Sequence, residues 1–192
     1  MENKFFTFIK PYLSFIDDGH FYRKPFRWLY ILLAILNLIF PLDVLYRAFD
    51  NRVFDSPANY VVAFLIVWLV ITFASWLSFQ LWWNRKEDVK KISAEGDEYI
   101  ATPGVSHFIQ TFGEWLGTWI GLVGGSVALI TTLILGDEGR YLTRQLDYDF
   151  LESGLLFVVL MPIYGFLIII GTRYLAEQGR ALVAIADNTR KP

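Results

Sequence analysis

The chain has 192 residues, of which 55% are hydrophobic and 18% aromatic, with a formal net charge of −2 and no cysteine. A soluble chain of this length normally carries more charge and fewer apolar residues. The near-neutral charge provides no basic field for nucleic acid, and the lack of cysteine excludes disulfides, thiolate metal sites and cysteine nucleophiles. The composition therefore favours an integral membrane protein, with the lipid bilayer as its first partner.

The first 16 residues are rich in aromatic and aliphatic side chains, which would be costly to leave in water. We predict an interfacial amphipathic helix over residues 4–16, lying on the membrane surface. A contact with a partner protein is the alternative. No small-residue cleavage site follows the first long apolar run, so we interpret that run as a retained membrane anchor rather than a signal peptide.

Four apolar runs are each long enough to cross a hydrocarbon core about 30 Å thick, which requires about 20 residues of helix. They cover residues 25–46, 59–83, 114–135 and 154–172, and aromatic residues gather near their ends, as in membrane-interface belts. The helices of a soluble bundle would instead carry polar stripes at a 3.6-residue period. The sequence therefore predicts an all-α protein, a bundle of four transmembrane helices that forms one domain over residues 1–192.

Basic residues are unevenly distributed among the segments outside these spans. Thirteen of the 17 lysines and arginines lie in the N-terminal segment, the loop between the second and third spans, and the C-terminal tail. The other two loops hold only Arg47, Arg52, Arg140 and Arg144. Because segments rich in lysine and arginine stay in the cytoplasm, both termini are expected there.

The loop before the third span contains a second amphipathic stretch. Pro103 and Gly104 interrupt the chain, and apolar residues then recur at helical spacing from Val105 to Phe112. This pattern predicts a helix that lies at the membrane interface over residues 105–113 and runs into the third span.

Glycines recur every four residues in the third span, at Gly113, Gly117, Gly121 and Gly125. On a helix this spacing produces a groove without side chains, along which another helix can approach closely. Two hypotheses follow for this helix-packing seam. It packs against another helix of the same chain, or it forms an interface with a second copy or a partner protein.

Charged residues mark the predicted cytoplasmic ends of the last two spans. Glu114 opens the third span, and Arg173 and Glu177 follow the fourth, four residues apart on one helical face. If the two spans are antiparallel neighbours, Glu114 and Arg173 lie at similar depth and can pair, which would lower the cost of holding both charges near the bilayer. Structural anchoring is the first interpretation of this set, a proton or ion route is the second, and catalysis is the third. Pro162 interrupts the fourth span and predicts a kink.

No catalytic, cofactor-binding or metal-binding set emerges from the sequence. His20 and His107 are the only histidines, and their spacing is not that of a metal site. The phosphate-binding, dinucleotide-binding and serine-nucleophile motifs are missing. We therefore expect a protein that is not an enzyme and holds no cofactor.

The end of the chain runs Arg173-Tyr174-Leu175-Ala176-Glu177 and closes on Ile185-Ala186-Asp187-Asn188-Thr189. This stretch resembles the end of small bacterial inner-membrane proteins that are grouped as a family with a domain of unknown function. Members of that family are shorter and have fewer spans, and the resemblance covers residues 173–189. It implies a location in the bacterial inner membrane and no particular activity.

Three functions remain open at this point. The first is a non-catalytic accessory, scaffold or assembly subunit that acts through helix–helix contacts with a membrane-protein partner or a second copy. The second is a small channel or transporter formed by oligomerisation. The third is a membrane enzyme that acts on a lipid.

Overall fold

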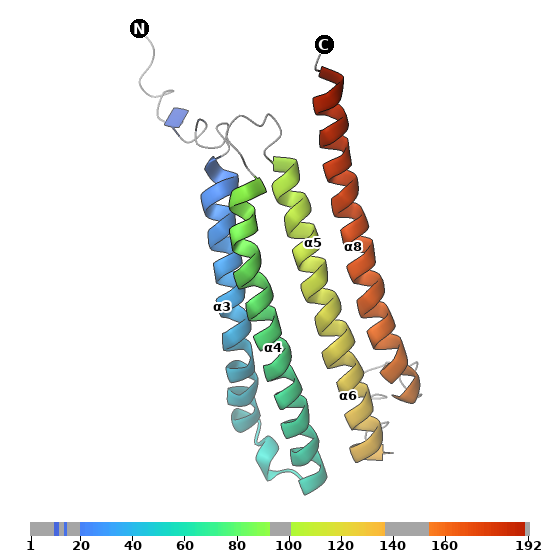
Figure 1. Ribbon diagram of the computed structural model, residues 1–192. Coiled ribbons are helices and arrows are strands. Elements are labelled where there is room, and N and C mark those ends of the chain that lie inside the picture. Colours follow the sequence, from blue (N-terminus) through green and yellow to red (C-terminus); the bar gives the residue numbers. More distant parts are fainter. Residues whose placement is uncertain (1–9, 12–13, 15–19, 93–100, 137–153, 191–192) are drawn as a thin grey trace.

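The computed structural model describes residues 10–11, 14, 20–92, 101–136 and 154–190 (Figure 1). Every element in these ranges is helical. The predicted interfacial helix over 4–16 lies almost entirely outside the described residues, as do Arg140 and Arg144.

The described chain forms four long helical rods. Their elements are α3 (His20–Asp50), the short 3₁₀ turn η1 (Val53–Asp55), α4 (Ala58–Ile92), α5 (Ala101–Trp119), η2 (Ile120–Gly124), α6 (Gly125–Ile130), η3 (Thr131–Leu135) and α8 (Gly154–Arg190). The elements α5, η2, α6 and η3 follow one another without a gap and make a single rod. Four helices long and apolar enough to cross a membrane confirm the predicted fold class.

Each rod is longer than a bilayer requires, because polar residues extend the helices beyond the apolar runs. The third candidate span covers Ala101–Leu135 and the fourth covers Gly154–Thr189. Large apolar side chains face outward along all four rods, including Leu42, Leu69 and Leu133. Such surfaces would be unfavourable in water but suit a hydrocarbon solvent.

The four rods stand in a row rather than in a closed square (Figure 1). Backbone contacts are most extensive between α3 and α4 and between α5 and α8, which form two helical hairpins, and α4 joins the hairpins by packing along α5, η2, α6 and η3. The two ends of the row are therefore α3 and α8. The start of α3, the end of α4, the start of α5 and the end of α8 all lie at the same end of the molecule, which we call the arginine end for its residues Arg27, Arg85, Arg173 and Arg180.

At the arginine end, aromatic side chains fill the space between the two hairpins. Tyr30 and Trp82 are fully buried and meet edge to face, with ring centroids 5.1 Å apart. Phe108 from α5 packs against both rings. Large flat rings can span the distance between helices whose backbones are not in close contact, so this cluster ties α3 to α5.

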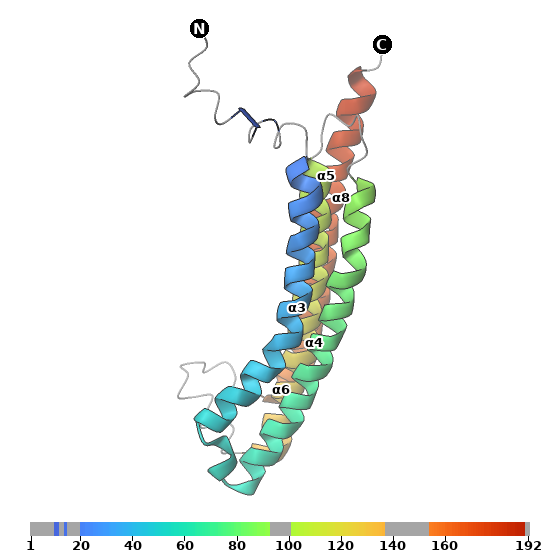
Figure 2. The same cartoon turned by 90° about the vertical axis from the view of Figure 1, so that its left-hand side faces the viewer.

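Prolines lie inside two of the helices without ending them. Figure 2 shows that α3 curves toward its C-terminal end, and Pro41 in that half has no amide N–H for the helical ladder. The indole of Trp68 on α4 donates to the carbonyl of Pro41 at 2.9 Å, which holds this half of α3 against its neighbour. Helix α8 is likewise continuous through Pro162. The kink predicted there stays a prediction.

Residues 105–113 differ from the expected interfacial helix. They belong to the uninterrupted helix α5, and Ser106, His107 and Thr111 are buried. Pro103 lies in the first turn, where a proline costs no helical hydrogen bond, so it opens the helix instead of breaking it. Contacts with other helices therefore define the position of this segment.

Candidate functional site

The most concentrated polar group of the described chain surrounds Glu114 on α5. Its carboxylate accepts hydrogen bonds from Arg85 of α4 at 2.8 Å and from Arg173 of α8, through Nη2 at 2.7 Å and Nε at 3.0 Å. Glu114 is 8% exposed, whereas the side chain of Arg173 is half-exposed. One buried carboxylate thus ties three helices together at the arginine end.

Two further residues extend this network along α5 and α8. Gln110 lies one helical turn before Glu114 and donates to its carboxylate at 3.1 Å. The amide oxygen of Gln110 in turn accepts a hydrogen bond from Arg180 at 3.0 Å. Glu177 is exposed, and no ion pair of the described residues joins it to Glu114 or Arg173. The structure therefore brings Glu114 and Arg173 together and leaves the third predicted member outside.

The geometry limits what this carboxylate can do chemically. Both oxygens of Glu114 are occupied, and two of the donors are guanidinium groups, which keep their charge. A general base or a proton relay needs a carboxylate that can take up and release a proton. The arrangement supports structural anchoring more than an ion route.

A second polar contact is buried at the same end. The hydroxyl of Tyr30 lies 2.8 Å from Nδ1 of His107, and the two rings stack with centroids 5.7 Å apart. Thr111 donates to the backbone carbonyl of His107 at 2.9 Å. The other ring nitrogen of His107, Nε2, is buried and has no partner among the described atoms. This contact joins α3 to α5 by a hydrogen bond where the surroundings are otherwise aromatic.

The glycines of the third rod lie against α8, so the seam is used within the chain. A Cβ at Gly113 would overlap Thr172, and a Cβ at Gly117 would overlap the carbonyl of Gly165. At Gly121 and Gly125 the nearest groups belong to Pro162, at 3.4 and 3.3 Å from an ideal Cβ. On the α8 side of the seam, Gly165 likewise has no room for a side chain. The two backbones approach closely along the seam, as in other glycine-mediated membrane helix pairs.

The π-helical segment η2 lies within this seam and adjusts its direction. Four residues exceed one α-helical turn by about 40°, so glycines at that spacing drift around a regular helix. A π turn closes over more residues and rotates less per residue, which opposes the drift. Gly121 and Gly124 lie within η2, and Gly125 follows it directly. The π turn therefore helps to keep the later glycines facing α8.

Sequence reasoning missed two partners of Glu114. Arg85 and Gln110 were not expected beside Glu114, because each belongs to a segment whose neighbours depend on the fold. The spacing of Gln110 four residues before Glu114 was the one available signal. Within the described residues, no group of three histidine or acidic side chains is placed to hold a metal ion.

Comparisons with protein families, with curated proteins and with solved structures gave no match. The functional argument for this chain therefore rests on its own geometry.

Proposed function

We propose that this protein is a non-catalytic accessory or scaffold subunit of the bacterial inner membrane, and that the exposed end of α8 binds its partner. Helix α8 has 37 residues, which corresponds to about 55 Å at 1.5 Å per residue, whereas a hydrocarbon core is about 30 Å thick. Figure 1 shows its C-terminal part standing beyond the other three rods. Arg180 still bonds Gln110 of α5, so the ten residues 181–190, about three turns, are available outside the bundle.

The apolar residues on this protruding part carry the proposal. Leu182 is 66% exposed and Ile185 is 60% exposed, and their three-residue spacing puts them on one face. Both follow Arg173 and Arg180, so lipid tails do not reach them if those arginines lie at headgroup level. An apolar stripe outside the hydrocarbon is stabilised by a groove or helix of another protein.

The proposed orientation places the arginine end, and with it both termini, in the cytoplasm. Among the described residues, Arg27, Arg85 and Arg173 flank the spans at this end, whereas Arg47 and Arg52 flank them at the opposite end. The positive-inside rule over the whole chain supports this assignment, and the resemblance of residues 173–189 to bacterial inner-membrane proteins supports the compartment. Single cysteines at Ser56→Cys and Asn188→Cys test it, because the native chain has no cysteine. A membrane-impermeant thiol reagent applied to intact cells should label only the first.

The partner is tested by placing a photo-crosslinking amino acid at position 182 in cells that produce the protein. We expect one discrete product that also contains a second, different protein. The same group at Ala184, an exposed residue about 200° away around the helix, should give much less product.

The double variant Leu182→Ser and Ile185→Ser provides the second arm. It should lose the crosslinked partner while keeping the wild-type yield of folded protein, since neither side chain is buried. Crosslinks between two copies of this chain would show that this surface forms a homo-oligomer instead of binding a different protein. No discrete product at position 182 would refute the proposal.

A further inference from the structure

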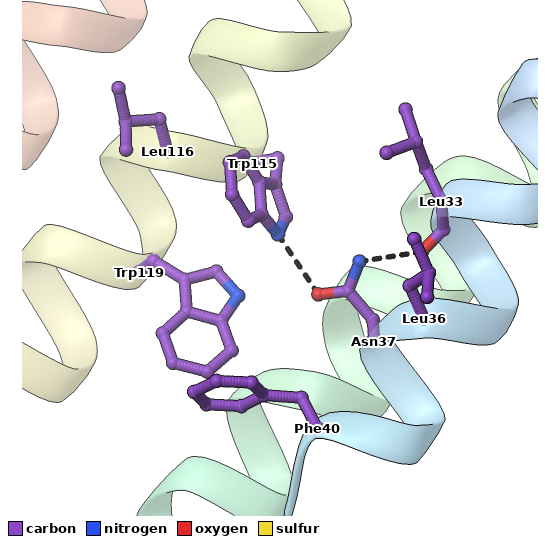
Figure 3. Close-up of a pocket in the computed structure, with 7 residues that line it drawn as sticks. All are labelled: Leu33, Leu36, Asn37, Phe40, Trp115, Leu116 and Trp119. Atoms are coloured by element: carbon purple, nitrogen blue, oxygen red, sulfur yellow. Dashed lines mark hydrogen bonds between the residues drawn. The ribbon is translucent and has the colours of Figure 1, made fainter.

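An apolar groove opens between α3 and α5, on the side where the two hairpins meet. Its volume is about 450 Å³, within the size range of small-molecule sites. Four residues of α3 and three of α5 line it, namely Leu33, Leu36, Asn37, Phe40, Trp115, Leu116 and Trp119 (Figure 3). Phe40 and Trp119 meet edge to face with centroids 5.4 Å apart and narrow the end of the groove farther from Arg27.

The polar groups along this groove are satisfied by the protein itself. The amide oxygen of Asn37 accepts a hydrogen bond from the indole of Trp115 at 3.0 Å, and its nitrogen donates to the carbonyl of Leu33 at 2.8 Å (Figure 3). The indole of Trp119 donates to Ser78 on α4 at 2.7 Å. Each polar side chain that lines the groove thus already has a partner within the protein, and the rest of the lining is apolar, which favours an apolar occupant.

The side chains that cross the groove discriminate between two apolar occupants. From Leu33 to Phe40 the groove runs along seven residues of α3, or about 10 Å. Within this length the Trp115–Asn37 hydrogen bond and the Phe40–Trp119 ring contact connect α5 to α3. A helix, about 10 Å wide with its side chains, therefore cannot enter between α3 and α5. A single hydrocarbon chain, no wider than a leucine side chain, fits.

We propose that this groove binds one acyl chain of a membrane phospholipid. The chain enters from the leaflet at the arginine end, because Arg27 lies at the start of the candidate span and only about 9 Å of helix separates it from Leu33. The bound chain fills the space between α3 and α5, whose contact is made by side chains rather than by close backbones. It thereby joins the two hairpins, independently of any protein partner at α8.

Photo-crosslinking with a phospholipid that carries a diazirine on its acyl chain tests the proposal. The full chain is reconstituted in phosphatidylcholine and phosphatidylglycerol bilayers that contain a small fraction of this lipid, irradiated, and mapped by mass spectrometry. We expect adducts on the groove residues at about threefold or greater yield than on Leu156 and Leu167 of α8, which are 51% and 54% exposed and contact bulk lipid.

Two variants separate a bound chain from general lipid contact. Leu36→Trp fills the groove from a half-exposed position and should lower the adducts on Phe40 and Trp119 to the level of α8. Leu167→Trp adds the same ring on the outer face of α8 and should leave the groove adducts unchanged. If Leu36→Trp fails to fold, Leu36→Phe serves as the smaller filling variant.

Either of two outcomes overturns the proposal. Equal adduct yields in the groove and on α8 would mean that the groove holds only bulk lipid. Loss of groove adducts as the protein density in the bilayer rises, together with chain-to-chain crosslinks at Leu36, would mean that a second copy occupies it.

Discussion

Replacing Gly165 by alanine tests whether the close approach of α5 and α8 holds the second hairpin together. Gly165 is buried, and a Cβ on it would overlap the carbonyl of Gly117 and come within 2.9 and 3.0 Å of the backbone nitrogen and Cα of Gly121. These are backbone atoms of the neighbouring rod, so no side-chain rotation relieves the overlap. The two helices must separate.

The expected loss of stability follows from two opposing terms. Overpacking a well-packed contact costs about 1–3 kcal/mol, and a clash with backbone belongs near the top of that range. Alanine in place of glycine in a helix returns up to about 1 kcal/mol. We therefore expect Gly165→Ala to lower the free energy of unfolding by about 2 kcal/mol.

The matched control lies six residues away on the same helix. A Cβ at Gly171 would meet nothing within 4 Å, and the residue is exposed. Gly171→Ala should therefore be neutral or stabilising by up to about 1 kcal/mol, from helix propensity alone. Equilibrium unfolding in mixed micelles with increasing dodecyl sulfate, followed by tryptophan fluorescence, measures both variants under identical conditions.

The comparison is decisive because both substitutions add the same methyl group to α8. Equal stabilities of Gly165→Ala and Gly171→Ala would show that the seam is not closely packed in the membrane protein. The same result would remove the explanation given for the glycine spacing. A destabilised Gly171→Ala would point instead to a contact on the outer face of α8.

Three further results are expected. Glu114→Gln should lower the free energy of unfolding by about 1–3 kcal/mol in the same assay, because Arg85 and Arg173 lose their counter-charge. Glu177→Gln, at an exposed position, should change the free energy of unfolding by less than about 0.5 kcal/mol. Equal effects of the two substitutions would contradict the anchoring role of Glu114. Tyr30→Phe should cost about 1–2 kcal/mol, since both ring nitrogens of His107 are then without a partner. Hydrogen exchange of the backbone amides near the start of α5 measures this loss. If exchange in Tyr30→Phe matched that of the wild type, the Tyr30–His107 contact would contribute nothing to stability.

Residue chemistry alone decided that the described chain has four membrane-spanning helices and which residues form them. Hydrocarbon cannot satisfy a free backbone group, so an apolar run of about 20 residues must be helical whatever surrounds it. This is why runs such as 25–46 and 59–83 are read directly from the sequence. The prediction for 105–113 rested instead on amphipathic spacing, which fits both a membrane surface and the inside of a bundle. In the structure this segment packs inside the bundle, where His107 and Thr111 are buried.

Part of the candidate site around Glu114 could also be predicted from the sequence. Glu114 and Arg173 stood out because ionisable groups near the bilayer are costly and need partners. Their pairing required only that two consecutive spans be antiparallel neighbours. Arg85 could not be added, because its place beside Glu114 depends on how α4 crosses α5, which no local pattern encodes.

The tertiary structure alone decided the open row of helices, the partner of the glycine seam and the groove between α3 and α5. A stripe of glycines indicates that another helix can approach closely. Only the fold determines which helix this is, here α8 with Gly165. The groove has no sequence signature at all, since leucines and aromatics on two helices look the same whether they touch or stand apart. Such spaces depend on distances between helices, and those distances arise from all side chains packing together.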